Sequence, residues 1–310
     1  MTPIQAITQA PKKTLHLELD LSKELSVSIA GDNVYRLEEL TVSLGGSRGF
    51  NSKPNTFIEH LKESGFLDSR YIKFQDGFGT PQGLLVNYPL EAAYHFEFNL
   101  ADAALKIRLM RDRMGIMGEH TIVFNGRELK NEAWEPFRVY DQNNIAADIS
   151  SFLKAGLNTI DVFVTANEDW HGLSDPMYLL GNFGVFLKEG KFTIEKAPPT
   201  TLPSAKAVEG YPFYSGKFFF DTELLVESKG DYEFFTIELP EKYRIYECVE
   251  LSINGHELGP RCFSPYVWHG STELLKPGLN PVKLSIANTL GNMLEGCYYD
   301  YDEHKTVYIR

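Results

Sequence analysis

The stretch FLKAGLNTIDVFVTAN at residues 152–167 recurs in nearly the same form as LLKPGLNPVKLSIANT at residues 274–289. Each copy contains Leu-Lys-x-Gly-Leu-Asn and then places apolar residues at every second position. This alternation predicts a strand with one buried face. We expect Gly156 and Gly278 to end a short helical turn before each strand, in the left-handed conformation that glycine adopts without steric cost. The candidate N-caps of the two turns are Asp148 or Ser150, and Ser271 or Thr272.

The similarity between the two copies extends upstream. An Asn-Gly pair lies between alternating segments in each copy, at residues 125–126 and 254–255, and it predicts a two-residue β-hairpin of type I′. Further upstream, a Tyr-Pro pair leads into an aromatic-rich segment at residues 88–100 and again at residues 211–224. These landmarks occur in the same order and indicate a duplicated unit rich in short strands. The sequence therefore predicts an all-β fold of two tandem antiparallel β-sandwiches.

A boundary between the sandwiches is indicated by EKAPPTTLPSAKAVEG at residues 195–210, which contains three prolines and little apolar material. We predict a disordered or linker segment, a first sandwich with an N-terminal extension, a linker and a second sandwich. Their bounds are, in that order, 1–14, 15–197, 198–209 and 210–310.

The N-terminal extension contains two alternating segments, at residues 15–21 and 34–44, which we interpret as extra strands of the first sandwich. Between them and the repeat, NTFIEHLKESG at residues 55–65 predicts a short amphipathic helix, capped by its Asn or Thr and stopped by Gly65. A small separate domain over residues 15–87 is the alternative interpretation.

Charge and composition limit the partners. The 310 residues carry a net charge of −12, which works against binding of nucleic acid or anionic membranes, because both require a surplus of Lys and Arg. The first residues, MTPIQAITQAPKK, lack the apolar core of a secretory signal, so we expect a cytoplasmic location by default.

The cysteine count excludes a disulfide framework. Three cysteines, Cys248, Cys262 and Cys297, lie in the last quarter of the chain without regular spacing. We expect buried free thiols, and one disulfide plus a spare thiol is the alternative.

The segment VELSINGHELGPRCFSPYVWHGSTELLKPGLNPVKLSIANTLGN at residues 249–292 resembles the jelly-roll, galactose-binding-like sugar-binding domain of glycoside hydrolase family 2. In that family an Asn-Gly hairpin, a following Gly, a Pro-Tyr-like loop and a Lys-x-Gly-x-Asn turn recur in this order. Most of the chain looks like the C-terminal part of large bacterial glycosidase-like proteins, including relatives of the family 106 α-L-rhamnosidases.

The resemblance implies the accessory part of a glycosidase without its catalytic part, because a catalytic barrel takes roughly 250 residues. We therefore expect a non-catalytic carbohydrate-binding or accessory module, which binds a mono- or oligosaccharide or supports a catalytic glycosidase domain or chain. One alternative is a fragment or subunit of a glycoside hydrolase whose barrel is absent. The other is a purely structural module that packs against another chain.

Aromatic residues beside polar ones are the best candidates for a sugar contact, because flat C–H faces of sugars stack on rings while hydroxyls bond to charged and amide groups. We expect ligand contacts in the polar loop NEDWHGLSDPMY, around Trp134, and in RCFSPYVWHG, with the Trp170-His171 pair as first choice. The full set is Trp134, Glu168, Asp169, Trp170, His171, Asp175, Arg261, Tyr266, Trp268 and His269. A role as a core or interdomain anchor is the competing explanation for each Trp.

Two further motifs favour no functional site. The pair Asn167-Glu168 resembles a glycosidase acid/base dyad, but it follows the repeated strand, so we expect a solvated loop and no catalytic residue. The segment CYYDYDEHK at residues 297–305 offers oxygen ligands for Ca²⁺, but it lacks the glycine and the later glutamate of an EF-hand. We expect an acidic surface loop there, no metal site and no cofactor.

Overall fold

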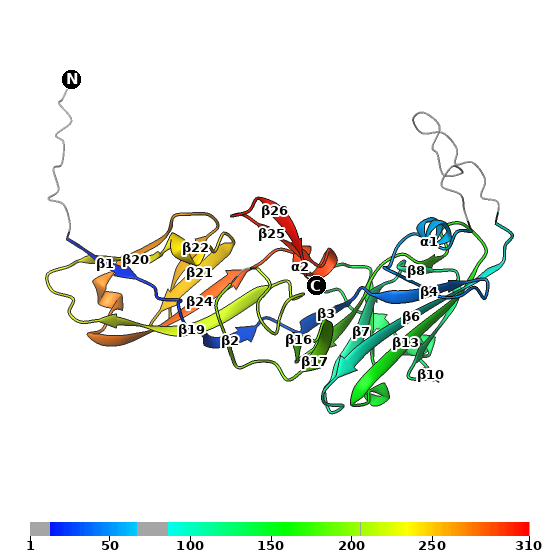
Figure 1. Cartoon of the computed structure of the whole chain (residues 1–310). Helices are drawn as coiled ribbons and strands as arrows, with labels where there is room; N and C mark the ends of the chain where they lie inside the picture. The colour runs from blue at the N-terminus through cyan, green and yellow to red at the C-terminus, as the bar shows by residue number, and fades with distance from the viewer. Residues whose placement is uncertain (1–12, 67–85, 205, 310) are drawn as a thin grey trace, which may run out of the picture. The chain divides into compact units, whose positions relative to one another are not determined.

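The computed structural model describes residues 13–66, 86–204 and 206–309, and it is an all-β protein, as predicted (Figure 1). The chain divides into two compact units, one formed by residues 32–197 and the other by residues 1–31 together with residues 198–309. We call them the middle unit and the terminal unit. The predicted disordered segment at residues 1–14 lies almost wholly outside the described residues. Within those residues, no helix is long and apolar enough to cross a membrane.

The middle unit is a sandwich of two main sheets. The larger has the order β10-β9-β13-β6-β17-β16, with β4 and β5 attached through β6. Its strands are β4 (Leu40–Leu44), β5 (Phe50–Ser52), β6 (Leu90–Leu100), β9 (Glu119–Phe124), β10 (Arg127–Glu128), β13 (Gly156–Ala166), β16 (Gly184–Lys188) and β17 (Lys191–Glu195). The smaller sheet has the order β11-β12-β7-β15-β3. It contains β3 (Asn33–Leu37), β7 (Ile107–Asp112), β11 (Glu135–Pro136), β12 (Asn144–Asp148) and β15 (Met177–Gly181).

Two short elements close the core of the middle unit. Helix α1 (Phe57–Glu63) has Thr56 as its N-cap, and Gly65 follows it with a φ of +78°, so the predicted helix is confirmed. The two-stranded pair of β8 (Ile116–Met117) and β14 (Gly172–Leu173) brings Gly172 under Phe57 and the hydroxyl of Tyr94. A side chain at Gly172 would meet both, which is why a residue without Cβ stands there.

The terminal unit also has two main sheets. The larger has the order β18-β2-β19-β24-β21-β22, and the smaller has the order β1-β20-β23. The strands are β1 (Thr14–Glu18), β2 (Leu25–Ile29), β18 (Thr200–Thr201), β19 (Lys217–Val226), β20 (Phe234–Leu239), β21 (Cys248–Ile253), β22 (His256–Arg261), β23 (Tyr266–Ser271) and β24 (Gly278–Ala287). A hairpin of β25 (Cys297–Asp300) and β26 (Lys305–Tyr308) follows the short helix α2 (Gly291–Leu294).

The N-terminal strands correct the predicted domain bounds. β1 pairs in parallel with β20, and β2 pairs with β19 and β18, so both belong to the terminal unit and not to the first sandwich. The segment predicted as a linker at residues 198–209 is likewise built into this unit, because its Thr200–Thr201 strand adds to the edge of β2. The alternating pattern of β1 and β2 indicates strands but does not say which distant strand each one pairs with.

The two copies of the repeated stretch form the same arrangement. In each unit four strands lie in one order, β10-β9-β13-β6 in the middle unit and β22-β21-β24-β19 in the terminal unit. The hairpins between β9 and β10 and between β21 and β22 have positive φ at both central residues, 49° and 79° in one and 51° and 81° in the other. This is the backbone that a type I′ Asn-Gly turn requires.

A buried asparagine joins the turn to the hairpin in each copy. Asn158 is fully buried; its side chain donates to the carbonyl oxygens of Lys154 (2.8 Å) and Gly156 (3.0 Å) and accepts from the Lys154 N–H (3.0 Å). Its Oδ1 also accepts from the side-chain amide of the hairpin residue Asn125 at 2.8 Å. We call this set of bonds the asparagine clamp.

The terminal unit repeats the clamp bond for bond. Asn280 bonds to the backbone of Lys276 and Gly278 and accepts from Asn254, the hairpin asparagine, at 2.7 Å. Each hairpin asparagine also donates to a carbonyl oxygen of the 3-10 turn that lies before the repeated strand. The acceptor is the last residue of that turn, Phe152 for Asn125 and Leu274 for Asn254.

The capping predictions are partly correct. Ser271 caps the turn Thr272–Leu274 by accepting from the Glu273 N–H. In the other copy Ile149 is the N-cap, so neither predicted residue holds that position, although Asp148 Oδ1 accepts from the Ser150 N–H at 2.8 Å. Gly156 and Gly278 have φ values of 84° and 93°, and each is the first residue of its strand and lies beyond the end of the turn.

Removal of a clamp leaves backbone and amide groups without partners inside a sandwich. We expect Asn280→Ala, and equally Asn158→Ala, to lower the free energy of unfolding of its sandwich by about 2–4 kcal/mol. Urea unfolding followed by circular dichroism measures this, with the exposed Asn143→Ala as a control that changes stability by less than about 0.5 kcal/mol. Clamp variants as stable as that control would contradict the assignment.

Candidate functional site

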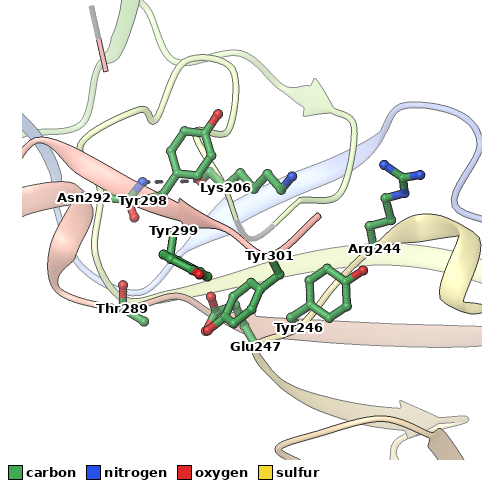
Figure 2. Close-up of a pocket in the computed structure, with 9 residues that line it drawn as sticks. All are labelled: Lys206, Arg244, Tyr246, Glu247, Thr289, Asn292, Tyr298, Tyr299 and Tyr301. Atoms are coloured by element: carbon green, nitrogen blue, oxygen red, sulfur yellow. Dashed lines mark hydrogen bonds between the residues drawn. The ribbon is translucent and has the colours of Figure 1, made fainter. Parts of the chain in front are cut away.

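The terminal unit contains a hollow rich in tyrosine, with an empty volume of about 380 Å³ that includes space open to solvent (Figure 2). We call it the tyrosine hollow. Its lining residues are Lys206, Arg244, Tyr246, Glu247, Thr289, Asn292, Tyr298, Tyr299 and Tyr301.

The register of β21 and β24 brings the lining segments together. Cys248, the first residue of β21, pairs with Ala287, the last residue of β24. The residues just before β21, Tyr246 and Glu247, therefore lie at the same end of the sheet as Thr289, which follows β24. The β25–β26 hairpin contributes the remaining tyrosines from the next segment of the chain (Figure 1).

Three of the tyrosines form a continuous aromatic surface. The ring centroids of Tyr246 and Tyr301 are 5.1 Å apart, and those of Tyr301 and Tyr299 are 5.0 Å apart with nearly perpendicular planes. The three side chains remain 37%, 42% and 46% exposed for Tyr246, Tyr301 and Tyr299. Rings that touch one another and still face solvent can accept a flat ligand face.

Ion pairs fix the rim of the hollow. Lys206 Nζ lies 3.0 Å from Asp300 Oδ2 and 3.5 Å from Asp302 Oδ2, and Arg244 Nη1 lies 3.0 Å from Asp302 Oδ2. The Tyr246 hydroxyl donates to Asp302 Oδ1 at 2.9 Å. The hydrogen bond from Lys206 holds the pKa of Asp300 below its usual range. The carboxylates of Asp300 and Asp302, two of the candidate calcium ligands, are thus engaged by the side chains of the rim.

The floor of the hollow is anchored by a buried amide. Asn292 donates its side-chain N–H to the carbonyl oxygens of Pro212 at 3.0 Å and Lys206 at 3.4 Å. Its neighbour Met293 donates its backbone N–H to the Ser215 hydroxyl at 3.1 Å. These bonds hold α2 and the Lys206 segment in place, so that the polar groups of the floor have a defined position.

In the middle unit, the loop that follows β13 contains the predicted Trp170-His171 pair. Trp170 is 65% exposed, and its ring centroid lies 6.4 Å from that of His171. The Tyr88 hydroxyl donates to Asp169 Oδ1 at 2.6 Å, and His171 Nδ1 accepts from the Asn167 N–H at 3.2 Å. Glu168 is exposed and Asp175, beyond β14, is exposed beside Gly115. The structure therefore brings Glu168, Asp169, Trp170 and His171 together in one ordered loop.

Trp134 reaches this loop through a chain of contacts. Its ring covers the guanidinium of Arg111 at 4.8 Å, and Arg111 Nη2 lies 3.3 Å from His120 Nε2. The His120 ring is bonded to the Gly118 carbonyl oxygen at 2.9 Å, and a Cβ on Gly118 would touch His171. Burial lowers the pKa of His120, and the guanidinium charge of Arg111 lowers it further. Trp134 is thus a packing partner of a buried arginine.

Two of the predicted contacts in the terminal unit are core residues. Trp268 on β23 is fully buried and donates its indole N–H to the Gly259 carbonyl oxygen at 2.8 Å. Tyr266 is buried as well, and its hydroxyl donates to the Glu247 carbonyl oxygen at 2.7 Å. The prediction of ligand contacts at these two residues is corrected: both join the two sheets of the sandwich.

The other two predicted residues of this segment, Arg261 on β22 and His269 on β23, do not line the hollow. Arg261 donates to the carbonyl oxygens of Val267 (2.8 Å) and Pro260 (2.9 Å), which ties its guanidinium to its own hairpin. His269 is exposed on β23, opposite Thr236.

Sequence reasoning missed the tyrosines of the hollow although their signal is visible. CYYDYDEHK contains Tyr298, Tyr299 and Tyr301 beside acidic residues, and the acidic surface loop expected there gives these tyrosines no role. Tyr246 and Arg244 precede β21 in a segment without any recognisable motif.

No protein-family model matches the chain, and no curated protein matches it. Solved structures that are similar include a β-D-mannosidase from Dictyoglomus thermophilum, with 10% identity and a TM-score of 0.37 over 82% of this chain and 31% of that one. A glycosyl hydrolase family 2 member from Bacteroides cellulosilyticus has 15% identity and a TM-score of 0.32 over the same shares. An exo-chitosanase from Amycolatopsis orientalis has 10% identity and a TM-score of 0.36 over 82% and 29%. The chain spans about a third of the length of these proteins.

The contrast between the tryptophans is testable by fluorescence. We expect Trp268→Phe to cost about 2–3 kcal/mol of unfolding free energy, because it opens a cavity and leaves the Gly259 carbonyl without its donor. Trp170→Phe changes stability by less than about 0.5 kcal/mol but removes most of the iodide-quenchable emission, because that ring is exposed. Strong quenching that persists in Trp170→Phe and vanishes in Trp268→Phe would contradict these placements.

The cysteines differ from their predicted burial. Cys262 is exposed, and Cys248 and Cys297 are partly buried, so the expectation of buried thiols is wrong. Val249 on β21 pairs with Arg261 on β22, and Cys248 and Cys262 are the next residues beyond this antiparallel pair. Their Sγ atoms lie 3.4 Å apart.

Both are free thiols in the structure, so the alternative of one disulfide plus a spare thiol stays a prediction, which this pair would fulfil on oxidation. The folded protein is treated with a small-molecule disulfide and then unfolded, and its thiols are titrated. We expect exchange with Cys248 and Cys262 to lower the number of titratable thiols from three to one. Cys262→Ser prevents intramolecular closure, and Cys297→Ser serves as a control that still loses both remaining thiols. Equal oxidation of all three cysteines would contradict the pairing.

Proposed function

We propose that the chain is a non-catalytic carbohydrate-binding module of glycosidase type and that the tyrosine hollow is its binding site. One observation carries this proposal: three exposed and mutually contacting tyrosine rings line one hollow together with charged and amide groups. That combination matches the chemistry of a sugar, which has apolar C–H faces and a rim of hydroxyls.

The aromatic rings supply the apolar part of such a site. A pyranose face that covers the rings of Tyr246 and Tyr301 removes apolar area of both partners from water. The two rings are inclined at 47° to each other, so they do not form one flat platform.

The polar groups of the hollow would orient the bound saccharide. The rim holds Lys206 and Arg244 as donors and Thr289 as donor and acceptor around the same volume. Because Asp300 and Asp302 already fix the two cations, these groups are ordered before ligand arrives, which reduces the entropy lost on binding.

The glycosidase part of the proposal rests on the resemblance of residues 249–292 to the family 2 sugar-binding domain. In this proposal the chain presents a saccharide to, or is fixed beside, a catalytic glycosidase domain or chain. The catalytic partner and the likeness to relatives of the family 106 α-L-rhamnosidases belong to this proposal.

A second contact is proposed at the loop that follows β13. Trp170 is the most exposed aromatic ring among the predicted ligand residues, and its loop follows the strand that corresponds to β24 in the other unit. Its neighbours Glu168 and Asp169 offer acceptors for hydroxyl groups.

A glycan array probed with the purified chain identifies the saccharide, and calorimetry measures its affinity. We expect Tyr301→Ala to weaken binding about tenfold or more, because it removes the ring that contacts both of its neighbours. Tyr232→Ala is the matched control, since Tyr232 is an exposed tyrosine of the same unit away from the hollow, and we expect unchanged affinity.

The outcomes separate the possible roles. Retention of no glycan would contradict carbohydrate binding and favour a structural interaction module. Hydrolysis of aryl glycosides by the purified chain would contradict the non-catalytic assignment. Binding that Trp170→Ala abolishes and Tyr301→Ala leaves unchanged would transfer the site to the middle unit.

A further inference from the structure

The charges of the tyrosine hollow do not balance. Lys206 and Arg244 are its cations, and each is paired with Asp300 or Asp302. The fifth charged group, Glu247, lies within the hollow itself. Two positive and three negative groups leave one negative charge, and the ion pairs assign it to Glu247.

Glu247 has no compensating partner. Among the residues that the structure describes, its carboxylate makes no ion pair and no hydrogen bond, although its backbone carbonyl accepts from Tyr266. The residue is half-buried, and this burial raises the pKa of its carboxyl group. A carboxylate that is partly removed from water without a partner is costly, and a ligand cation or donor reduces that cost.

The rings beside Glu247 favour a cation over a neutral donor. Tyr246 precedes it in the chain, and Tyr301 lies 5.1 Å from Tyr246 between ring centroids (Figure 2). The face of an aromatic ring carries negative potential and attracts an ammonium group within about 6 Å of its centre. A carboxylate together with several ring faces is the arrangement by which proteins hold organic ammonium groups.

A bare metal ion fits this arrangement poorly. Ca²⁺ requires six to eight oxygen ligands, whereas Glu247 is the one carboxylate of the hollow that is not already engaged by a cation of the rim. An ammonium group needs only one carboxylate and the ring faces.

We infer that the tyrosine hollow selects an amino sugar, whose ammonium group pairs with Glu247 while the rings of Tyr246 and Tyr301 flank it. This inference rests on the proposed function, because it names the class of saccharide that the same site takes. Lys206 and Arg244 then face the ring hydroxyls and oppose a second ammonium group at the rim, so a single cationic sugar unit occupies the hollow.

Calorimetric titration of the full chain with three ligands tests the inference. The ligands are a β-1,4-linked glucosamine tetramer, the same tetramer in N-acetylated form, and the corresponding glucose tetramer. We expect the glucosamine tetramer to bind about tenfold or more tightly than the two neutral ligands, and the preference to shrink at high salt because screening weakens the charge pair.

Glu247→Gln keeps the shape of the side chain and removes its charge. We expect this variant to lose the preference for the glucosamine tetramer while its affinity for the neutral tetramers changes less than about twofold. Glu257→Gln is the matched control: it removes one negative charge from an exposed position on β22 and keeps the full preference. Melting temperatures equal to that of the wild type show that both variants are folded.

Each outcome has a distinct meaning. Binding of neutral tetramers as tight as that of the glucosamine tetramer would overturn the inference and leave the proposed function standing. A preference that survives in Glu247→Gln, or disappears equally in Glu257→Gln, would also overturn it, because the selectivity would then not arise at Glu247. If none of the three ligands binds and the glycan array retains nothing, the proposed function fails and the inference fails with it.

Discussion

The asparagine clamp is the constraint on which both sandwiches depend. Asn158 and Asn280 are fully buried, and each satisfies the backbone of a tight turn and the amide of a hairpin asparagine at once. Loss of either set would leave several polar groups unsatisfied in the core. Because the clamp fixes where β13 and β24 begin, it also fixes the register of the strands beside them, and a shift of one residue would turn every core side chain outward.

The clamp and the variable loops lie at opposite ends of the same strands. β24 begins at Gly278 beside the clamp and ends at Ala287, where the segment that lines the tyrosine hollow begins. The strand ends beside the clamp have the same structure in both units. The loops at the opposite ends differ: one contains the exposed Trp170, and the other contains a group of tyrosines. Recognition chemistry is thus confined to the segments that the repeated stretch does not constrain.

The fold was more predictable than the site. The Gly-Leu-Asn turn, the Asn-Gly hairpin and the alternating strands are local signals, and the structure contains each of them. The assignment of β1 and β2 failed because pairing such as Leu15 with Phe235 depends on distant residues. Trp268 and Trp170 stand in segments of similar composition, and only strand pairing decides that one is core and the other exposed. The tyrosine hollow is lined by Lys206, Arg244 and Tyr301 from three separate segments, and no local sequence pattern indicates that these segments meet.

The central claim is that ligand enters the tyrosine hollow. The most direct measurement is nuclear magnetic resonance of the protein with ring-labelled tyrosine and tryptophan, titrated with the saccharide that binds most tightly. The account predicts that the ring signals of Tyr246, Tyr299 and Tyr301, assigned by single Tyr→Phe variants, shift together with one dissociation constant. Tyrosine signals that stay unchanged while the indole signal of Trp170 shifts, or no shift in either set at saturating ligand, would contradict it.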